Sequence, residues 1–369
     1  MQNIYNDMIK FKNAKCMFNK IKRNCKNKQA IYNYKLYLNE NLYRVLELLY
    51  KREYKFSKYR IFMIRDPKFR IIMSENIPDK LVNHMVSKYI LLPCLESKLI
   101  DTNVATRIDK GSGYAFDKFC DYVNKLKYEN KEIYVLKIDI KKYFYNIDHK
   151  ILMNKVRKYI KDKEALRIIS QILNTTNVNY INERINYLKL KRIEYINSLN
   201  ISLKEKEEKI NTIRSIPLYH YGKGLPIGNM TSQIFAIFYL NDVDHYIKEN
   251  LHFKYYVRYM DDLLIVDTDK EKLLKSFKLI ENEINKLNLE TNKKSNIYKL
   301  SDGISFLGYK FILKNNKLII RYNNGTIRRI TKKLKYLKKN DIEQYNRSFG
   351  SYQGYLCKSN TKFNDRYNY

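Results

Sequence analysis

The segment 255–266, with the sequence YYVRYMDDLLIV, constrains the fold of this chain more than any other. Two apolar runs flank the polar pair Asp261-Asp262, a pattern that predicts a β-hairpin whose turn carries both acids. A third aspartate, Asp139, lies near the end of a strand-like run at 133–140, where side chains alternate with period two. Because a carboxylate beside a hydrophobic core is costly unless it is paired or binds a cation, these acids indicate a functional site.

The chemistry of such a site would be that of a hard divalent cation, which prefers oxygen ligands. Two magnesium ions about 4 Å apart can activate an attacking hydroxyl and stabilise a leaving pyrophosphate. The alternative is that each aspartate only caps a turn, where this residue is common. The quartet Tyr259-Met260-Asp261-Asp262 between apolar strands favours the cation site.

The charge of the chain predicts a polyanionic partner. Lysine and arginine number 72 against 38 acids, which gives a net charge of +34. The positive charges repel one another in a compact molecule, and binding to a polyanion would relieve this repulsion. The alternative is that part of the net charge is surface lysine that reflects an AT-rich genome. Apolar runs such as 234–240 fall far below the roughly 20 residues of a membrane span. The first residues lack the apolar core of a signal peptide, so we expect a cytoplasmic protein without a membrane partner.

Outside these motifs, periodicity predicts a mixture of helices and strands. Residues 1–55 read as charged helices, and the lysine- and glutamate-rich stretch 181–215 reads as a solvated helical insertion. Strands are predicted over 304–313 and 317–322. A helix over 326–339 carries seven cations and no acid, which favours binding to a phosphate backbone over a merely solvated face.

Seven segments, taken in chain order, resemble the motifs of reverse transcriptases. They are DPKFRII (66–72), RIDKGSG (107–113), LKIDIKKYF (136–144), GLPIGNMTSQ (224–233), YMDD (259–262), LETNKKS (289–295) and FLGY (306–309). The resemblance covers roughly residues 60–313 and is closest to bacterial enzymes. It implies an α+β fold of the right-hand polymerase type, with fingers, a palm built on an antiparallel sheet with helices, and a small helical thumb.

The resemblance also implies a division of the chain into four parts. They are an N-terminal helical extension (1–55), fingers (56–132), a palm (133–322) and a thumb (323–369). The palm would include the insertion at about 181–215 and part of the fingers near 216–228. Because only about 60 residues follow FLGY, we expect no endonuclease, integrase or RNase H segment.

Four residues are implied as the metal site. Asp139 and Asp261 match the ligands of two Mg²⁺ ions, with Mn²⁺ as an alternative ion. The backbone carbonyl of Ile140 would be a further ligand, and Asp262 a supporting carboxylate.

Basic residues are implied as contacts of the incoming nucleotide. Arg70 matches the fingers arginine that clamps the triphosphate, with Lys68 assisting it unless it is plain surface charge. Lys110, in the basic glycine-bearing loop, is a further substrate-binding candidate. Lys294 matches the lysine that protonates the pyrophosphate, but the adjacent Lys293 could take this role instead.

Three other positions bear on nucleotide selection. Phe144 falls where the family keeps an aromatic gate against the 2′-hydroxyl, the alternative being an ordinary core phenylalanine. Ile227 and Gln233 stand where retroviral and group II intron enzymes usually have glutamine and proline. This pattern resembles reverse transcriptases of diversity-generating retroelements, which are error-prone at template adenines, although Ile227 could merely pack against the fingers.

The resemblance thus predicts an RNA-directed DNA polymerase that adds deoxynucleotides to a primer 3′-hydroxyl. Its partners would be an RNA template, a DNA or RNA primer and deoxynucleoside triphosphates. A retroelement enzyme would also bind a small basic accessory protein. The alternatives are a phage-defence or other bacterial reverse transcriptase that copies its own noncoding RNA, and a catalytically idle relative that only binds nucleic acid.

Overall fold

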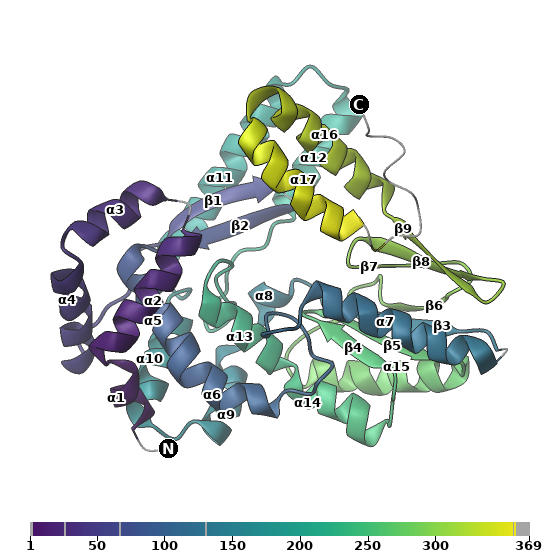
Figure 1. Cartoon of the computed structure of the whole chain (residues 1–369), viewed down its shortest axis with the longest axis horizontal. Helices are drawn as coiled ribbons and strands as arrows, with labels where there is room; N and C mark the ends of the chain where they lie inside the picture. The colour runs from purple at the N-terminus through teal and green to yellow at the C-terminus, as the bar shows by residue number, and fades with distance from the viewer. Residues whose placement is uncertain (1–2, 26, 66–67, 130, 357, 359–369) are drawn as a thin grey trace. The chain divides into compact units, whose positions relative to one another are not determined.

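The chain folds into two compact units, each built from segments that are separate in the sequence (Figure 1). This computed structural model describes residues 3–25, 27–65, 68–129, 131–356 and 358. The first unit comprises Met1–Ile100, Lys141–Asp244 and Glu283–Glu290, and the second comprises Asp101–Ile140, His245–Asn282 and Thr291–Tyr369. None of the described helices is both long and apolar enough to cross a membrane.

The first unit begins with the helices that the sequence predicts over 1–55. They are α1 (Ile4–Met8), α2 (Phe11–Asn24), α3 (Lys28–Leu36) and α4 (Leu38–Tyr50). The backbone N–H of Tyr5 in α1 donates a buried hydrogen bond of 3.0 Å to the carboxylate of Asp162. The same carboxylate caps a later helix by accepting from Glu164 and Ala165, so it joins the start of the chain to that helix.

A β-hairpin follows, with strands β1 (Arg60–Arg65) and β2 (Phe69–Ser74) paired antiparallel. Asp66 and Pro67, part of the DPKFRII motif, lie outside the described residues. The chain continues into α5 (Ile77–Val86), the π-helical turn η1 (Ser87–Leu91), α6 (Leu92–Leu95) and η2 (Glu96–Lys98). Asn76 caps α5, because its side chain accepts from the backbone N–H of Asp79 at 2.8 Å.

The rest of the first unit is helical. Its elements are α8 (Tyr143–Asn146), α9 (His149–Tyr159), α10 (Lys163–Asn174), α11 (Asn179–Ser198), α12 (Leu203–Arg214), α13 (Met230–Tyr239) and most of α14 (Asn241–His245). Helices α11 and α12 are the predicted insertion. One side of them is not solvated, because Ile181, Ile185 and Ile213 are buried in a core that includes Ile71 of the hairpin.

The second unit contains a four-stranded antiparallel sheet with the strand order β4-β5-β3-β6. The strands are β3 (Tyr134–Asp139), β4 (Tyr256–Tyr259), β5 (Asp262–Asp267) and β6 (Asn296–Lys299). The neighbouring helical segments are α7 (Ser112–Leu126), η3 (Lys127–Glu129), η4 (Tyr246–Asn250) and α15 (Lys270–Asn285), of which the last ends in the first unit. Phe116 and Phe119 of α7 pack into the core with Val135 of β3 and Leu264 of β5. The hairpin predicted over 255–266 is thus present as β4 and β5.

A second, three-stranded sheet corrects one prediction from the sequence. The single strand expected over 304–313 is wrong, because the chain turns back after β7 (Ile304–Phe306) into β8 (Tyr309–Lys314). The two turn residues Leu307 and Gly308 have φ of +50° and +88°. Two consecutive positive φ values are typical of a tight hairpin turn, and glycine adopts one of them without strain.

The strand β9 (Lys317–Tyr322) completes this sheet and leads into the helices α16 (Asn324–Asn340) and α17 (Ile342–Leu356). The basic helix predicted over 326–339 lies within α16. Its apolar side packs into the core of the second unit through Ile330 and Leu334. The cations of α16 are Arg328, Arg329, Lys332, Lys333, Lys335, Lys338 and Lys339.

Candidate active site

The four-stranded sheet brings the three predicted aspartates together. Asp139 is the last residue of β3, and its partner in the antiparallel register is Asp262, the first residue of β5. Tyr259 pairs with Asp262 in β4 and β5, so Met260 and Asp261 form the two-residue loop between these strands. Met260 has φ of +56°, which is the left-handed conformation that such short hairpin loops use. Asp261 therefore lies at the hairpin turn, directly beside the cross-strand pair of acids.

The pKa of Asp261 depends on the carboxylates of Asp262 and Asp139. Burial, together with the negative charges of Asp262 and Asp139, raises the pKa of Asp261 to about 6. A hydrogen bond from its own backbone N–H and the charge of Arg258 act in the opposite direction. Like charges that share a site disfavour ionisation, and a bound cation reverses this effect. The electrostatics of the turn thus favour a positively charged ligand.

Arg258 stabilises this turn, although no motif in the sequence marks it as functional. Its side chain is fully buried, and its guanidinium Nη1 donates a 2.8 Å hydrogen bond to the carbonyl of Met260. Its backbone bonds to Thr102 and Val104 at 2.9 and 3.1 Å. Burying a charged side chain is costly unless it has hydrogen-bond partners. The bond from Arg258 to the Met260 carbonyl meets this need and also holds the backbone next to Asp261 in place. The signal that could have revealed it is a lone cation in an otherwise apolar strand.

The lysine motif is attached to the same end of β3. The backbone N–H of Asn292 donates to the carbonyl of Asp139 at 2.7 Å, and the hydroxyl of Ser295 accepts from the Asp139 N–H at 3.1 Å. The loop between these two anchors contains Lys293 and Lys294, whose side chains are both exposed. Both lysines are consequently carried by a loop fixed to the backbone of Asp139, and the geometry does not choose between them.

Lys137 is a second cation near the acids that the sequence did not single out. It precedes Asp139 by two residues, so the two side chains share one face of β3. Its Nζ lies 3.6 Å from Oδ1 of Asp262 and donates to the carbonyl of Ser305 at 2.9 Å. Lys137 therefore neutralises part of the charge of Asp262 in this structure.

Lys110, also in the second unit, has local partners. Its Nζ donates to the side chain and the backbone carbonyl of Asp101 at 2.6 and 2.7 Å, and it lies over the ring of Tyr114. The hydrogen bond from Lys110 lowers the pKa of Asp101. These contacts order the loop before α7, and a role in substrate binding remains a prediction.

The first unit carries five of the predicted residues, Lys68, Arg70, Phe144, Ile227 and Gln233, whereas Ile140 belongs to the second unit. Arg70 is exposed on β2 opposite Ile64, and Lys68 is exposed just before this strand. Phe144 is half-buried in α8, with its ring 6.0 Å from that of Tyr143. Partial exposure leaves this ring available for a ligand, as a gate requires and as an ordinary core residue does not.

Ile227 connects the loop before α13 to the hairpin formed by β1 and β2. Its carbonyl accepts from the backbone N–H of Met73 at 2.9 Å, and its side chain packs on the core formed by α11 and the hairpin. The following Gly228 has φ of +140°, and a Cβ there would lie 2.4 Å from the Met73 carbonyl oxygen. Gln233 is half-buried on the first turn of α13. The side chain of Ile227 thus packs beside the β1–β2 hairpin, and its role in nucleotide selection stays a prediction.

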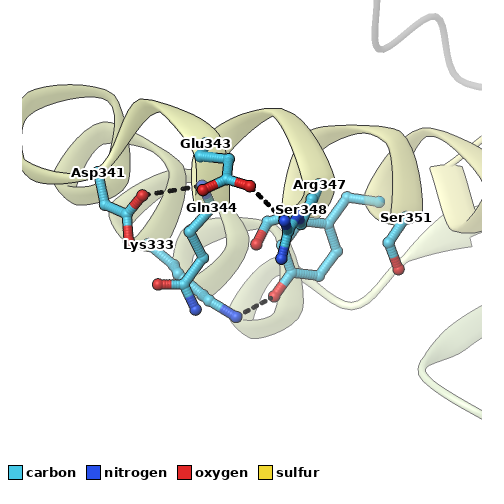
Figure 2. Close-up of a pocket in the computed structure, with 8 residues that line it drawn as sticks. Lys333, Asp341, Glu343, Gln344, Arg347, Ser348 and Ser351 are labelled. Carbon is cyan, nitrogen blue, oxygen red and sulfur yellow. Dashed lines mark hydrogen bonds and ion pairs between the residues drawn. The ribbon is translucent and has the colours of Figure 1, made fainter. Parts of the chain in front are cut away.

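A shallow hollow of about 430 Å³ lies between α16 and α17 in the second unit, and Figure 2 shows its lining residues. Polar groups of the lining bind one another. Lys333 donates to the hydroxyl of Tyr352 at 3.3 Å, and Arg347 pairs with Glu343 one turn away. We therefore do not assign a ligand to this hollow.

The oxygen ligands of the three aspartates fit magnesium, but in this structure their side chains are not arranged around a common metal position. Among the described residues, no three His, Cys, Asp or Glu side chains are grouped closely enough to hold a metal ion. Asp139, Asp261 and Asp262 nevertheless supply only carboxylate oxygens, which hard cations prefer. The raised pKa of Asp261 indicates the electrostatic strain that a cation would relieve.

Comparison with solved structures gives remote similarity to fungal telomerases. Telomerase from Candida albicans, in complex with a fragment of telomeric RNA, is 15% identical with a TM-score of 0.43 over 74% of this chain and 46% of that one. Apo telomerase from Candida tropicalis is 15% identical with a TM-score of 0.44 over 73% and 49%. A form truncated from its C-terminal domain is 16% identical with a TM-score of 0.42 over 73% and 55%. The chain thus spans about half the length of these proteins.

No curated protein sequence matches the chain significantly. A family model does match, under the description "Reverse transcriptase (RNA-dependent DNA polymerase)", over residues 64–311. This match includes the sheet that carries Asp139 and the hairpin that carries Asp261 and Asp262. The chain therefore belongs to the reverse transcriptase family and has the right-hand polymerase fold of that family.

Proposed function

We propose that this protein is an active RNA-directed DNA polymerase, which extends a primer 3′-hydroxyl with deoxynucleotides on an RNA template. The observation that carries this proposal is the pairing of Asp139 with Asp262 across β3 and β5, beside the loop that contains Asp261. A catalytically idle relative would be free to lose these acids. Their retention at one end of one sheet supports an active enzyme.

In this proposal Asp139 and Asp261 hold two Mg²⁺ ions, with Mn²⁺ as the alternative, and the Ile140 carbonyl and Asp262 complete the site. When bound, such ions activate the attacking hydroxyl and stabilise the leaving pyrophosphate. To bind a cation, Asp262 would have to give up its contact with Lys137. This contact is weak, because Nζ of Lys137 and Oδ1 of Asp262 are 3.6 Å apart. Arg258 would hold the Met260 carbonyl, so that the backbone next to Asp261 does not move when the ligand binds.

The roles of the basic residues follow the family resemblance. Arg70 and Lys68 would bind the triphosphate through charge-assisted hydrogen bonds, and Lys110 would add to substrate binding. Lys294 would donate a proton to the pyrophosphate, with Lys293 as the alternative donor. Both lysines are carried by the loop fixed to Asp139, which supports a role for this loop near the reacting phosphates.

Selection of the nucleotide would involve the first unit. The half-buried ring of Phe144 would exclude a 2′-hydroxyl and so favour deoxynucleotides. Ile227 would contact the nascent base pair through shape alone, since it offers no hydrogen bond, and Gln233 would support that contact from α13. The seven cations of α16 would track the phosphates of the template–primer duplex.

The biological role we favour is that of a retroelement enzyme with error-prone copying and a small basic accessory protein. The support is the pattern from Ile227 to Gln233, which resembles diversity-generating retroelements of bacteria. A phage-defence enzyme that copies its own noncoding RNA is the alternative, because related enzymes vary at these positions. The neighbouring genes distinguish the two, since a variable repeat pair beside this gene would indicate a retroelement.

The activity is tested by primer extension with purified protein, an RNA template, a DNA primer, deoxynucleotides and Mg²⁺. We expect product from the parent protein and a loss of at least a thousandfold for Asp261→Asn. Asp302→Asn is the matched control, because Asp302 is an exposed aspartate in the turn before β7. Undiminished extension by Asp261→Asn would overturn the proposal.

A further inference from the structure

The candidate gate residue Phe144 lies between two buried tyrosines of α8. The hydroxyl of Tyr143 donates to the carbonyl of Ala236 in α13 at 2.6 Å. The ring of Tyr145 packs on the ring of Tyr219, with the two centroids 4.8 Å apart. Tyr143 and Tyr145 are 2% and 8% exposed, whereas Phe144 is half-buried. The position of the Phe144 ring is therefore set by the contacts that hold this short helix on either side of it.

The loop before α13 is bound to the same short helix through its backbone. The N–H of Leu225 donates to the carbonyl of Phe144 at 2.7 Å, and the N–H of Gly224 donates to the carbonyl of Ile147 at 2.8 Å. Both bonds are at the short end of the usual range for N–H to oxygen. A shift of this loop would consequently move the backbone of Phe144 as well.

Tyr219 packs against the backbone of this loop. It is 4% exposed, and its hydroxyl donates to the carbonyl of Leu225 at 3.1 Å. Gly224 has φ of +91°, and a Cβ at this position would lie 2.6 Å from Cδ1 of the Tyr219 ring. The ring can lie against the loop because Gly224 has no side chain. Tyr219 thus contacts the loop directly and reaches α8 through the ring of Tyr145.

The backbone of Tyr219 is held in turn by one side chain of α11. The N–H of Tyr219 donates to Oδ1 of Asn182 at 2.9 Å, and Nδ2 of Asn182 donates to the carbonyl of Tyr219 at 2.8 Å. An amide that both donates to and accepts from one residue fixes its orientation as well as its position. The neighbouring Ile181 and Ile185 are buried in the core of the first unit, so the helix that carries this amide is itself anchored.

We infer that Asn182 is a positioning residue, which holds Phe144 in place through Tyr219 and the loop before α13. The inference deepens the proposed function and rests on it where it takes Phe144 as the gate against the 2′-hydroxyl. A gate works by close contact, so a displacement of about 1 Å is enough to weaken it. The insertion formed by α11 and α12 then sets how strictly the enzyme selects deoxynucleotides.

The first test measures nucleotide selectivity in primer extension, as kcat/KM for a deoxynucleotide divided by kcat/KM for the matching ribonucleotide. Asn182→Ala should lower this ratio about fivefold, because it removes both hydrogen bonds to Tyr219. Asn182→Gln retains an amide and should restore part of the ratio. Asn186→Ala is the matched control, since Asn186 is exposed one turn further along α11, and it should leave the ratio unchanged.

A double variant separates an action through Phe144 from general damage to the protein. If Asn182 acts through this ring, Asn182→Ala should have no further effect on the ratio once Phe144→Ala has removed the ring. A merely structural role would instead lower kcat for both classes of nucleotide and leave the ratio at the parental value. That outcome, or losses of selectivity that multiply in the double variant, would overturn the inference.

A third measurement needs no catalysis and so separates the inference from the proposed function. The chain contains no tryptophan, so Phe144→Trp introduces a single fluorophore at the gate position. Adding Asn182→Ala should shift its emission to longer wavelength and increase its quenching by acrylamide, because α8 is held less firmly. Adding Asn186→Ala should change neither property.

Identical emission and quenching in all three tryptophan proteins would overturn the inference. If the spectra change as expected but Phe144→Ala leaves the selectivity ratio at the parental value, the gate in the proposed function is refuted, while the link from Asn182 to this position is supported. Melting curves confirm that each variant is folded before it is compared.

Discussion

Replacing Asp261 by asparagine should stabilise the protein at neutral pH when no divalent cation is present. Burial and, after it, the charges of Asp262 and Asp139 raise the pKa of Asp261 from the ordinary value of 3.8 to about 6. In the unfolded chain the group ionises near its ordinary pKa. Folding therefore favours the protonated form, so this group contributes stability fully below pH 3.8 and loses that contribution as the pH rises through 6.

The magnitude follows from the size of this rise. A pKa that is higher by about 2 in the folded state corresponds to about 3 kcal/mol of stability that is lost once the carboxylate is charged. Asparagine is neutral at every pH and of similar shape, so it avoids this loss. For a chain of this length, about 3 kcal/mol corresponds to a change in Tm of about 5 °C.

The assay is thermal unfolding of the parent and Asp261→Asn in EDTA, at about pH 4.5 and about pH 7.5. The variant should melt higher at the upper pH, and the difference should shrink at the lower pH, where the parent is largely protonated. Adding Mg²⁺ should reduce the advantage of the variant at the upper pH, because a cation stabilises the charged parent. The exposed Asp302→Asn serves as the control. A difference between Asp261→Asn and the parent that is the same at both pH values would refute the reasoning.

Three further predictions concern the first unit. Phe144→Ala should raise the use of ribonucleotides relative to deoxynucleotides, measured as the ratio of kcat/KM, and an unchanged ratio would mean that the ring is not the gate. Ile227→Gln should lower misincorporation opposite template adenine, measured by sequencing the products, and an unaltered error spectrum would remove Ile227 from fidelity. Gly228→Ala should lower the stability by about 2 kcal/mol, because the new Cβ would clash with the Met73 carbonyl in a left-handed conformation. Gly325→Ala, where a Cβ meets nothing within 4 Å, is the matched control in melting experiments, and equal Tm values for the two variants would contradict the clash.

The acidic site could be predicted from the sequence because its signals are local. Apolar alternation identifies β3 and the two strands around Asp261. Because only two residues separate those two strands, they pair as a hairpin. That Asp139 lies opposite Asp262 is a long-range fact, which the sequence suggested only through the family's order of motifs. Arg258 was missed because a lone cation in an apolar strand does not by itself show that its side chain is buried.

The turn at Leu307-Gly308 shows where periodicity fails. Apolar residues continue on both sides of the turn, so the segment 304–313 reads as one strand. A single glycine was the only local sign of a break, and Leu307 adopts a positive φ that leucine rarely has. The pairing of β7 with β8 overrides this local cost, and tertiary pairing of this kind cannot be derived from the pattern alone.

The most direct test of the central claim is a double-mutant cycle on the acids, read by single-turnover primer extension in Mg²⁺. If Asp139 and Asp261 serve one metal site, either asparagine variant alone should abolish nearly all of the rate. The double variant should then lose little more than the single variants, because residues that act as a unit are not additive. Losses that multiply in the double variant, or a single variant that retains the parental rate, would contradict a shared site.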